Sequence, residues 1–334
     1  MVQKILDVAI IGAGLSGLMA ARRLTREGLR VAIFERSPIV GGRLATHSIG
    51  AGQADSGAQF FTVRSPEFGR HVEQWVDKGL VIEWSQGWSD GSISDTISDG
   101  HPRYVAQGGF GRLAEYLARG LTIVPSFPVT ALSAHHDRWE IGGTSPPAMN
   151  RARVALLCLP VPQALALLSK SGIVLPEEDR HVLNSIRYGS CLCGLLAVSG
   201  EGELPKPGAW QRPTAEISWV ADNHRKGISP HSRILTVHAG TAASQAYWHL
   251  DDGQILTWMW EEVRHWFAAD ARVTETQLVR WTYAVPLNPY KERYLLSGTE
   301  HPLFFAGDAF AGPRVEGAAL SGLAAAGAIL ANFS

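Results

Sequence analysis

A glycine-rich turn near the start of the chain constrains the fold more than any other feature. Asp7-Val8-Ala9-Ile10-Ile11 is a short apolar run that predicts a buried strand, and Leu18 to Glu27 predicts a helix ended by Gly28. Between them lies Gly12-Ala13-Gly14-Leu15-Ser16-Gly17, which has the spacing GxGxxG. The order of strand, glycine turn and helix is typical of the first half of a dinucleotide-binding βαβ unit.

Each glycine of this turn has a separate physical task. Gly12 permits the tight turn, Gly14 lets a pyrophosphate approach the backbone, and Gly17 lets the helix pack closely on the sheet. Val31-Ala32-Ile33-Phe34 predicts a second strand that ends at Glu35, whose carboxylate can accept hydrogen bonds from ribose hydroxyls. An acid here suits an unphosphorylated ribose, so FAD and NAD both remain open and NADP is disfavoured.

Length and composition indicate a soluble globular protein with two intertwined domains. The chain has 334 residues with 46% hydrophobic and 18% charged content, and its formal net charge of −1 gives no reason to expect nucleic acid or a membrane as a partner. No signal peptide or membrane-spanning run is evident, which favours a cytoplasmic location. Cys158, Cys191 and Cys193 have neither disulfide nor metal spacing, so we expect small core residues and no metal.

The segment after Glu35 is the first to resemble a known family. Glu35 followed by Gly41-Gly42-Arg43 resembles the FAD fingerprint of the amine-oxidase-type flavoproteins. The resemblance implies that Arg43 reaches the cofactor phosphates and that Gly42 lets the loop lie close to them. Arg36, next to Glu35, is assigned to the same cofactor-binding set. An NAD dehydrogenase has no need of this extension.

The C-terminal region resembles the second FAD-binding motif of the same family. His301 to Phe305 predicts a buried strand, Gly307-Asp308 follows it, and Val315 to Leu330 predicts a helix rich in alanine and glycine. The resemblance implies that Asp308 hydrogen-bonds the ribitol chain and that the helix N-terminus, with Arg314 and Val315, points at the flavin pyrimidine. A positive helix end there would stabilise the reduced flavin. Both motifs together predict non-covalent FAD.

Two further segments are assigned to the cofactor by this resemblance. Gly57, Ala58, Gln59 and Phe60 are the candidates for contact with the isoalloxazine ring, although Phe60 and Phe61 could equally be core residues. Val129, in a strand predicted over Val124 to Leu132, is expected at the adenine end. The glycines Gly317, Gly322 and Gly327 of the C-terminal helix are expected to serve loose packing against the sheet.

The predicted fold class is α/β. It comprises a two-dinucleotide-binding-domain FAD domain, Rossmann-like and of the glutathione-reductase type, and an α+β substrate domain with a mostly antiparallel sheet. The FAD domain is predicted over 1–65, 106–162 and 281–334, and the substrate domain over 66–105 and 163–280. A predicted amphipathic helix, Asp251 to Ala268, lies in the substrate domain. Nine of the eleven tryptophans of the chain also lie there, mostly as expected core residues.

Three features narrow the resemblance further: the segment 55–62, the run from Gly307-Asp308 into 314–318, and the middle-region segments 219–223 and 238–241. Together with the length of 334 residues, they make the chain resemble the bacterial renalase-like proteins over essentially its whole length. This resemblance implies oxidation of the 2- and 6-dihydro isomers of NAD(P) to NAD(P)⁺, with electrons passing to O2 to give hydrogen peroxide. Hydride transfer needs no strong base, and the sequence contains no Ser-His-Asp or Cys-His order. The candidate catalytic residues are His238, Trp219 and Asn223. Trp281 is, like Trp219, a candidate for an aromatic wall of the substrate pocket, and Arg103 and Tyr104 are weaker candidates for the same pocket.

Two other functions remain open. One is oxidation of an amine, or desaturation of a hydrophobic substrate, on the same scaffold. Amine oxidases often place a lysine near flavin N5, and none of the six lysines, Lys226 among them, lies in a matching sequence context. The other is a binding or redox-sensing flavoprotein with little turnover.

Overall fold

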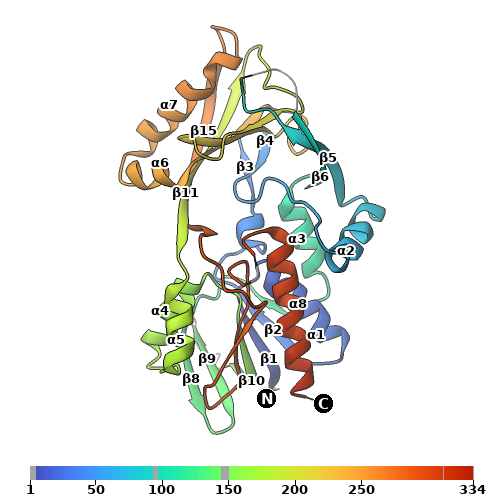
Figure 1. Ribbon diagram of the computed structural model, residues 1–334, viewed down its shortest axis with the longest axis vertical. Coiled ribbons are helices and arrows are strands. Elements are labelled where there is room, and N and C mark those ends of the chain that lie inside the picture. The colour runs from blue at the N-terminus through green and yellow to red at the C-terminus, as the bar shows by residue number, and fades with distance from the viewer. Residues whose placement is uncertain (1–4, 93–96, 144–149, 311, 334) are drawn as a thin grey trace. The chain divides into compact units, whose positions relative to one another are not determined.

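The computed structural model describes residues 5–92, 97–143, 150–310 and 312–333. It divides into two compact units, each of which is described by itself (Figure 1). Unit 1 consists of Met1–Gly42, Ala114–Tyr188 and Val285–Ser334, and unit 2 of Arg43–Leu113 and Gly189–Ala284. Helix α3 (Phe110–Ala118) is divided between them in sequence.

Unit 1 contains an eight-stranded sheet with a parallel core. β17, β10, β1, β2 and β7 pair in parallel, and β9, β8 and β16 pair antiparallel at its margins. β2 and β17 are short runs of fully buried apolar residues, and β1 is buried from Val8 to Ile11, as expected for strands covered on both faces. The bounds are β16 (Leu295–Ser297), β17 (Leu303–Phe305), β10 (Asn150–Leu157), β1 (Leu6–Ile11), β2 (Val31–Phe34), β7 (Ile123–Val124), β8 (Val129–His135) and β9 (Arg138–Gly143).

The helices of unit 1 cover this sheet. Helices α1 and α8 lie side by side (Figure 1). Helix α4 packs with β8, and residues of α4 and α5 belong to the hydrophobic cluster on the β9–β10 side. The bounds are α1 (Leu15–Arg26), α4 (Val161–Lys170), α5 (Glu177–Ser185) and α8 (Val315–Ala331).

Unit 2 contains a five-stranded sheet in the order β12-β13-β14-β11-β15, with antiparallel pairing from β12 to β11. Helix α7 packs on β11 at Gly194, where an added Cβ would lie 2.6 Å from Met259 Sδ. Two hairpins, β3–β4 and β5–β6, complete the unit. The bounds are η1 (Gly42–Leu44, beginning in unit 1), β3 (Thr46–Ile49), β4 (Gly52–Asp55), α2 (Pro66–Asp77), β5 (Val81–Trp88), β6 (Ile97–Ala106), β11 (Tyr188–Ser199), β12 (Ala209–Gln211), β13 (Ile217–Asp222), β14 (Ile234–Ala239), α6 (Thr241–Ala246), α7 (Asp252–Val263), η2 (Arg264–Trp266) and β15 (Arg272–Pro286).

The strand predicted over Val124 to Leu132 is wrong in its extent. β7 ends at Val124 and β8 begins at Val129, because the chain turns at Ser126, which has φ +52°. The turn is held by backbone bonds to the residues that follow β2: Ser126 N donates to Ser37 O, and Phe127 N donates to Glu35 O at 2.8 Å.

The helix predicted over Asp251 to Ala268 ends early. A capping box at Asp251 and Gln254 starts α7 as the pattern suggests. The helix stops at Val263, a single 3-10 turn follows, and Phe267 is extended. The N–H of Ala268 donates to Glu201 O at 2.9 Å, so a tertiary hydrogen bond replaces the helical one.

The predicted α/β class with a Rossmann-like dinucleotide fold is confirmed. The parallel pairs β1–β10, β1–β2, β10–β17 and β2–β7 belong to unit 1, and β12, β13, β14 and β11 of unit 2 pair antiparallel, which agrees with the mostly antiparallel sheet that was predicted. The boundaries predicted for the two functional domains stay a prediction. Within the part of the chain that the structure describes, no helix combines the length and apolar character needed to cross a membrane.

Candidate functional site

The glycine turn after β1 forms a cradle in unit 1. Gly12 has φ +105°, and a Cβ on Gly17 would lie 2.2 Å from Gly12 O, so a larger residue at position 17 would clash with the turn. A Cβ on Gly14 would meet no atom within 4 Å. No described side chain caps α1 at Gly14, so the first N–H groups of the helix face this open side and favour an anionic group.

Glu35, at the end of β2, holds this cradle in place. One carboxylate oxygen accepts from Ala13 N at 2.8 Å and the other from Ser37 N at 2.9 Å. The residue is buried, with 8% exposure. Glu35 therefore joins the turn to the strand end, and each oxygen keeps a lone pair for a ribose hydroxyl.

Gly41 and Gly42 continue the cradle. Gly41 has φ +114° and Gly42 has φ +55°, and Gly41 N donates to Ala13 O at 2.8 Å. Gly14 and Gly41 also form an isolated bridge. The second glycine pair therefore lies along the first turn. Arg36 is exposed, and Arg43, which begins unit 2, donates through Nη1 to Ala284 O.

The C-terminal motif lies at the same sheet edge as the glycine turn. β1, β10 and β17 are parallel neighbours, so Gly12 after β1 and Gly307 after β17 follow carboxyl ends on one side of the sheet. Gly307 N donates to the hydroxyl of Ser321 in α8 at 2.8 Å, and Asp308 is 9% exposed. α8 begins at Val315, and no described side chain caps it at Arg314.

Two of the three glycines of α8 are packed tightly, so the expectation of loose packing is wrong for Gly317 and Gly322. A Cβ on Gly317 would lie 2.2 Å from Gly312 O, and a Cβ on Gly322 would lie 2.1 Å from Ser16 O in the first turn of α1. A Cβ on Gly327 would meet only the guanidinium of Arg23, at 3.2 Å. Gly322 thus sets the distance between the two motif helices.

In unit 2, the segment Asp55–Gln59 is fixed by the surrounding strands. A Cβ on Gly57 would lie 2.1 Å from Arg43 O, and Ala58 N donates to the same carbonyl at 2.8 Å. Ser56 O accepts from His238 Nε2 and from Trp281 Nε1, both at 3.0 Å.

A buried lysine is the most important residue that the sequence did not reveal. Lys226 has a side chain with 0% exposure, and its Nζ donates to Asp55 Oδ2 at 3.0 Å and lies 3.5 Å from Gln59 Oε1. The other oxygen of Asp55 accepts from Thr46 Oγ1 at 2.6 Å and from Phe110 N at 2.9 Å. Burial lowers the pKa of Lys226, and the carboxylate of Asp55 opposes this.

The three candidate catalytic residues all contact this segment. Trp219 Nε1 donates to Gln59 Oε1 at 3.2 Å, and Asn223 Oδ1 lies 3.4 Å from Asp55 N. Asn223 is fully buried and also donates to Thr236 Oγ1, and Gln59 Nε2 donates to Asp55 O at 2.7 Å. The side chains of Gln59 and Asn223 are therefore anchors of the segment.

His238 is held in a single protonation state. Its Nε2 faces a carbonyl oxygen, which can only accept, so the ring carries its proton on Nε2. Burial lowers the pKa of His238 to about 4, and the nearby Lys226 charge acts in the same direction. At neutral pH this histidine is uncharged.

Four aromatic residues of unit 2 form a cluster, named here the aromatic cluster: Phe60, Trp84, Trp88 and Trp219. Trp88 lies 4.8 Å from Trp84, 4.9 Å from Trp219 and 5.0 Å from Phe60 between ring centroids. The indole N–H groups of Trp84 and Trp88 are buried and have no partner among the described residues. Phe60 and Trp84 keep partial exposure.

Comparison with known proteins identifies the family. The family of flavin containing amine oxidoreductases matches residues 92–330, and the NAD(P)-binding Rossmann-like domain matches residues 10–78. The chain belongs to the flavin containing amine oxidoreductase family. Membership in this family indicates FAD as the cofactor. The cradle of unit 1 fits that cofactor, because an anionic pyrophosphate can lie where a Gly14 Cβ would be and ribose hydroxyls can reach Glu35.

The similarity to individual proteins differs in sequence identity and in the share of each chain that is covered. An L-amino-acid oxidase of Echis ocellatus is 39% identical over 90 residues, which cover 25% of this chain and 17% of that protein. The chain matches between 8% and 21% of the length of the curated relatives. Putrescine oxidase and the cyclohexylamine oxidase of Brevibacterium oxydans share the fold, with TM-scores of 0.72 and 0.71 at 16% and 14% identity. Each alignment covers at least 98% of both chains.

Several other predicted positions can now be placed. Val129 is the first residue of β8, and Arg314 is exposed before α8. Arg103 on β6 pairs with Asp99, and Tyr104 stacks on Phe61 at 5.6 Å. Among the described residues no group of three or more His, Cys, Asp or Glu side chains is arranged to hold a metal ion.

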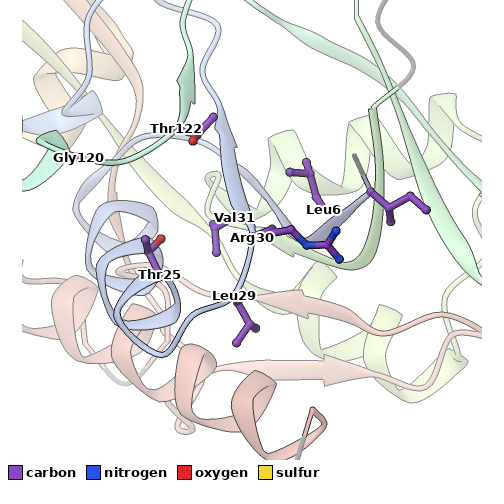
Figure 2. A pocket seen from close by; sticks show the side chains of 8 residues that line it. Leu6, Thr25, Leu29, Arg30, Val31, Gly120 and Thr122 are labelled. Carbon is purple, nitrogen blue, oxygen red and sulfur yellow. The ribbon is translucent and has the colours of Figure 1, made fainter. Parts of the chain in front are cut away.

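Figure 2 shows the side chains that line a further cavity of unit 1. It has a volume of about 390 Å³ and lies where β1 and β2 begin, at the opposite ends of these strands from the glycine turn. It therefore lies at the other edge of the sheet from the glycine cradle. Its lining residues are Ile5, Leu6, Thr25, Leu29, Arg30, Val31, Gly120 and Thr122.

Glu35→Gln is expected to weaken FAD binding about tenfold, equal to about 1.4 kcal/mol, because an amide has one acceptor oxygen for the two N–H groups that the carboxylate now holds. The measurement is the flavin content and the FAD dissociation constant of the apoprotein. Glu27→Gln, at the exposed end of α1, is the matched control and should bind FAD normally. Equal affinity in both variants would remove Glu35 from the cofactor site.

His238 is expected to make stability fall in acid. Its pKa is lowered in the folded state, so the unfolded chain binds more protons once the pH falls below about 6.5, and the stability present above that pH is lost toward pH 4. The lowered pKa alone would remove about 2 kcal/mol of unfolding free energy between pH 7 and pH 5. Because the residue keeps some exposure, we expect a smaller loss of about 1 kcal/mol. Urea unfolding at both pH values should show this loss in the wild type and not in His238→Gln.

Proposed function

We propose that this protein is an FAD-dependent oxidase that removes a hydride from a neutral dihydronicotinamide, most readily the 2- and 6-dihydro isomers of NAD(P), and delivers the electrons to O2 to give hydrogen peroxide. When bound, FAD supplies the hydride acceptor. The proposal also takes the cytoplasm as the location and small molecules as the only partners.

The aromatic cluster is the observation that supports this substrate class. Its rings offer flat apolar surface for a planar ring, with aromatic pairs favoured at separations of 4.5–7 Å. The unpartnered N–H groups of Trp84 and Trp88 can donate to a carbonyl oxygen such as that of a carboxamide. A dihydronicotinamide carries both a flat ring and a carboxamide.

The buried polar groups near the cluster suit a reaction without a strong base. His238 is neutral and its proton is engaged by Ser56 O, and Asp55 is paired with Lys226. Removal of a hydride from a dihydronicotinamide requires no proton abstraction, so these residues would serve to orient the Asp55–Gln59 segment and to exclude water.

The experiment is anaerobic stopped-flow reduction of the yellow holoprotein. The reductants are an equilibrated mixture of dihydro-NAD isomers, pure 1,4-NADH, and a panel of primary amines. Fast bleaching by a minor component of the isomer mixture alone supports the proposal, and hydrogen peroxide should form when air is admitted. Bleaching by ordinary NADH or by nothing offered would overturn it.

Amine oxidation is the second candidate, favoured by the shared fold with putrescine oxidase and cyclohexylamine oxidase. In that case one of the amines should bleach the flavin faster than the isomer mixture does. A desaturase of a hydrophobic substrate would leave all three reductants inactive, as would a flavin-binding protein with little turnover.

A further inference from the structure

Lys226 places a positive charge against the aromatic cluster. Its Nζ lies 5.7 Å from the ring centroid of Trp84 and 5.6 Å from that of Phe110. In the part of the chain that the structure describes, it is the only cation positioned over a ring of the cluster. Each ring face therefore receives the cation at a cation–π distance, in a site without solvent exposure.

The carboxylate of Asp55, which balances the charge of Lys226, uses its other oxygen for two further hydrogen bonds. Asp55 accepts from Thr46 and from Phe110 N through Oδ1, and Oδ2 takes the lysine. Gln59 Oε1 lies near Nζ and accepts a hydrogen bond from Trp219 Nε1. Through Gln59, the ammonium is therefore linked to a second member of the cluster. The group presented to the Trp84 ring is thus the ammonium.

A cation fixed against these rings discriminates ligands by charge. A second cation stacked on the cluster would be repelled by Lys226, and the repulsion is strong because the site is desolvated. A neutral planar ring meets no such penalty. Loss of a hydride converts a neutral dihydronicotinamide into a nicotinamide cation, so substrate and product differ by one positive charge on the ring.

We propose that Lys226 is a specificity-determining residue that admits neutral rings to the aromatic cluster, disfavours ammonium and pyridinium ligands, and promotes release of the cationic product. This rests on the proposed function, because it takes the cluster as the place where the substrate ring binds.

The test uses two probes that share one ring and differ in charge, nicotinamide and 1-methylnicotinamide. Binding to the oxidised holoprotein at pH 7 is followed by quenching of tryptophan fluorescence, which needs no turnover. The variants are wild type, Asp55→Asn, and Lys226→Met combined with Asp55→Asn, which removes both charges together. Lys78→Met, at an exposed position of unit 2, is the matched control.

The wild type should bind nicotinamide about tenfold more tightly than 1-methylnicotinamide, and Lys78→Met should not differ. The double variant should reduce this ratio about fivefold, and Asp55→Asn should also reduce it, because without the carboxylate only burial acts on the pKa of Lys226 and the neutral amine is favoured. An unchanged ratio in the double variant, or binding of neither probe by the wild type, overturns the role of Lys226. Stopped-flow reduction by the dihydro isomers tests the proposed function independently of either result.

Discussion

Gly322→Ala should destabilise the protein by about 3 kcal/mol and leave the purified protein with little flavin. The added methyl would lie 2.1 Å from the carbonyl oxygen of Ser16, which is backbone and cannot rotate away. α8 would have to move off α1 at the point where α1 begins, next to the glycine turn that forms the dinucleotide cradle. Urea unfolding and the ratio of flavin to protein absorbance measure both effects.

Gly327→Ala in the same helix is the matched control. Its methyl would meet only the guanidinium of Arg23 at 3.2 Å, the end of a flexible side chain. Alanine favours a helix over glycine by about 1 kcal/mol, so this variant should be as stable as the wild type or slightly more so. A similar loss of unfolding free energy in both variants would mean that α8 tolerates no added side chain along this face, and that the contact with Ser16 does not account for the effect of Gly322→Ala.

The dinucleotide fold and the cofactor could be predicted because their signals are local. The spacing of Gly12, Gly14 and Gly17 and the acid at Glu35 follow from a strand, a turn and a helix that are consecutive in the chain. The second motif, Gly307-Asp308, was placed by resemblance, and the parallel pairing of β1, β10 and β17 brings it to the same sheet edge.

The contacts that could not be predicted join residues far apart in sequence. Lys226 reaches Asp55, 171 positions earlier, and nothing in the surrounding Asp222-Asn223-His224-Arg225 run distinguishes a buried lysine from a solvated one. Gly322 meets Ser16 across an even longer separation. Even the ends of elements depended on such contacts, since the bond from Ala268 to Glu201 ends the helical stretch that the apolar pattern extends.

Lys226→Met should destabilise the protein by about 4 kcal/mol, although the new side chain fits an apolar environment. The substitution leaves the Asp55 carboxylate, at 0% exposure, with only Thr46 and Phe110 N as partners and without a cation. Removal of one partner of a buried pair is costly because a desolvated charge remains uncompensated, whereas removal of both is often nearly neutral.

Addition of Asp55→Asn to Lys226→Met should therefore restore most of the lost stability. The asparagine oxygen can still accept from Thr46 and from Phe110 N, and no buried charge remains. Urea unfolding of wild type, both single variants and the double variant gives the coupling energy of the pair. If the two losses simply add, the residues do not form a compensating ion pair, and the charge assigned to Lys226 at the aromatic cluster would have to be abandoned as well.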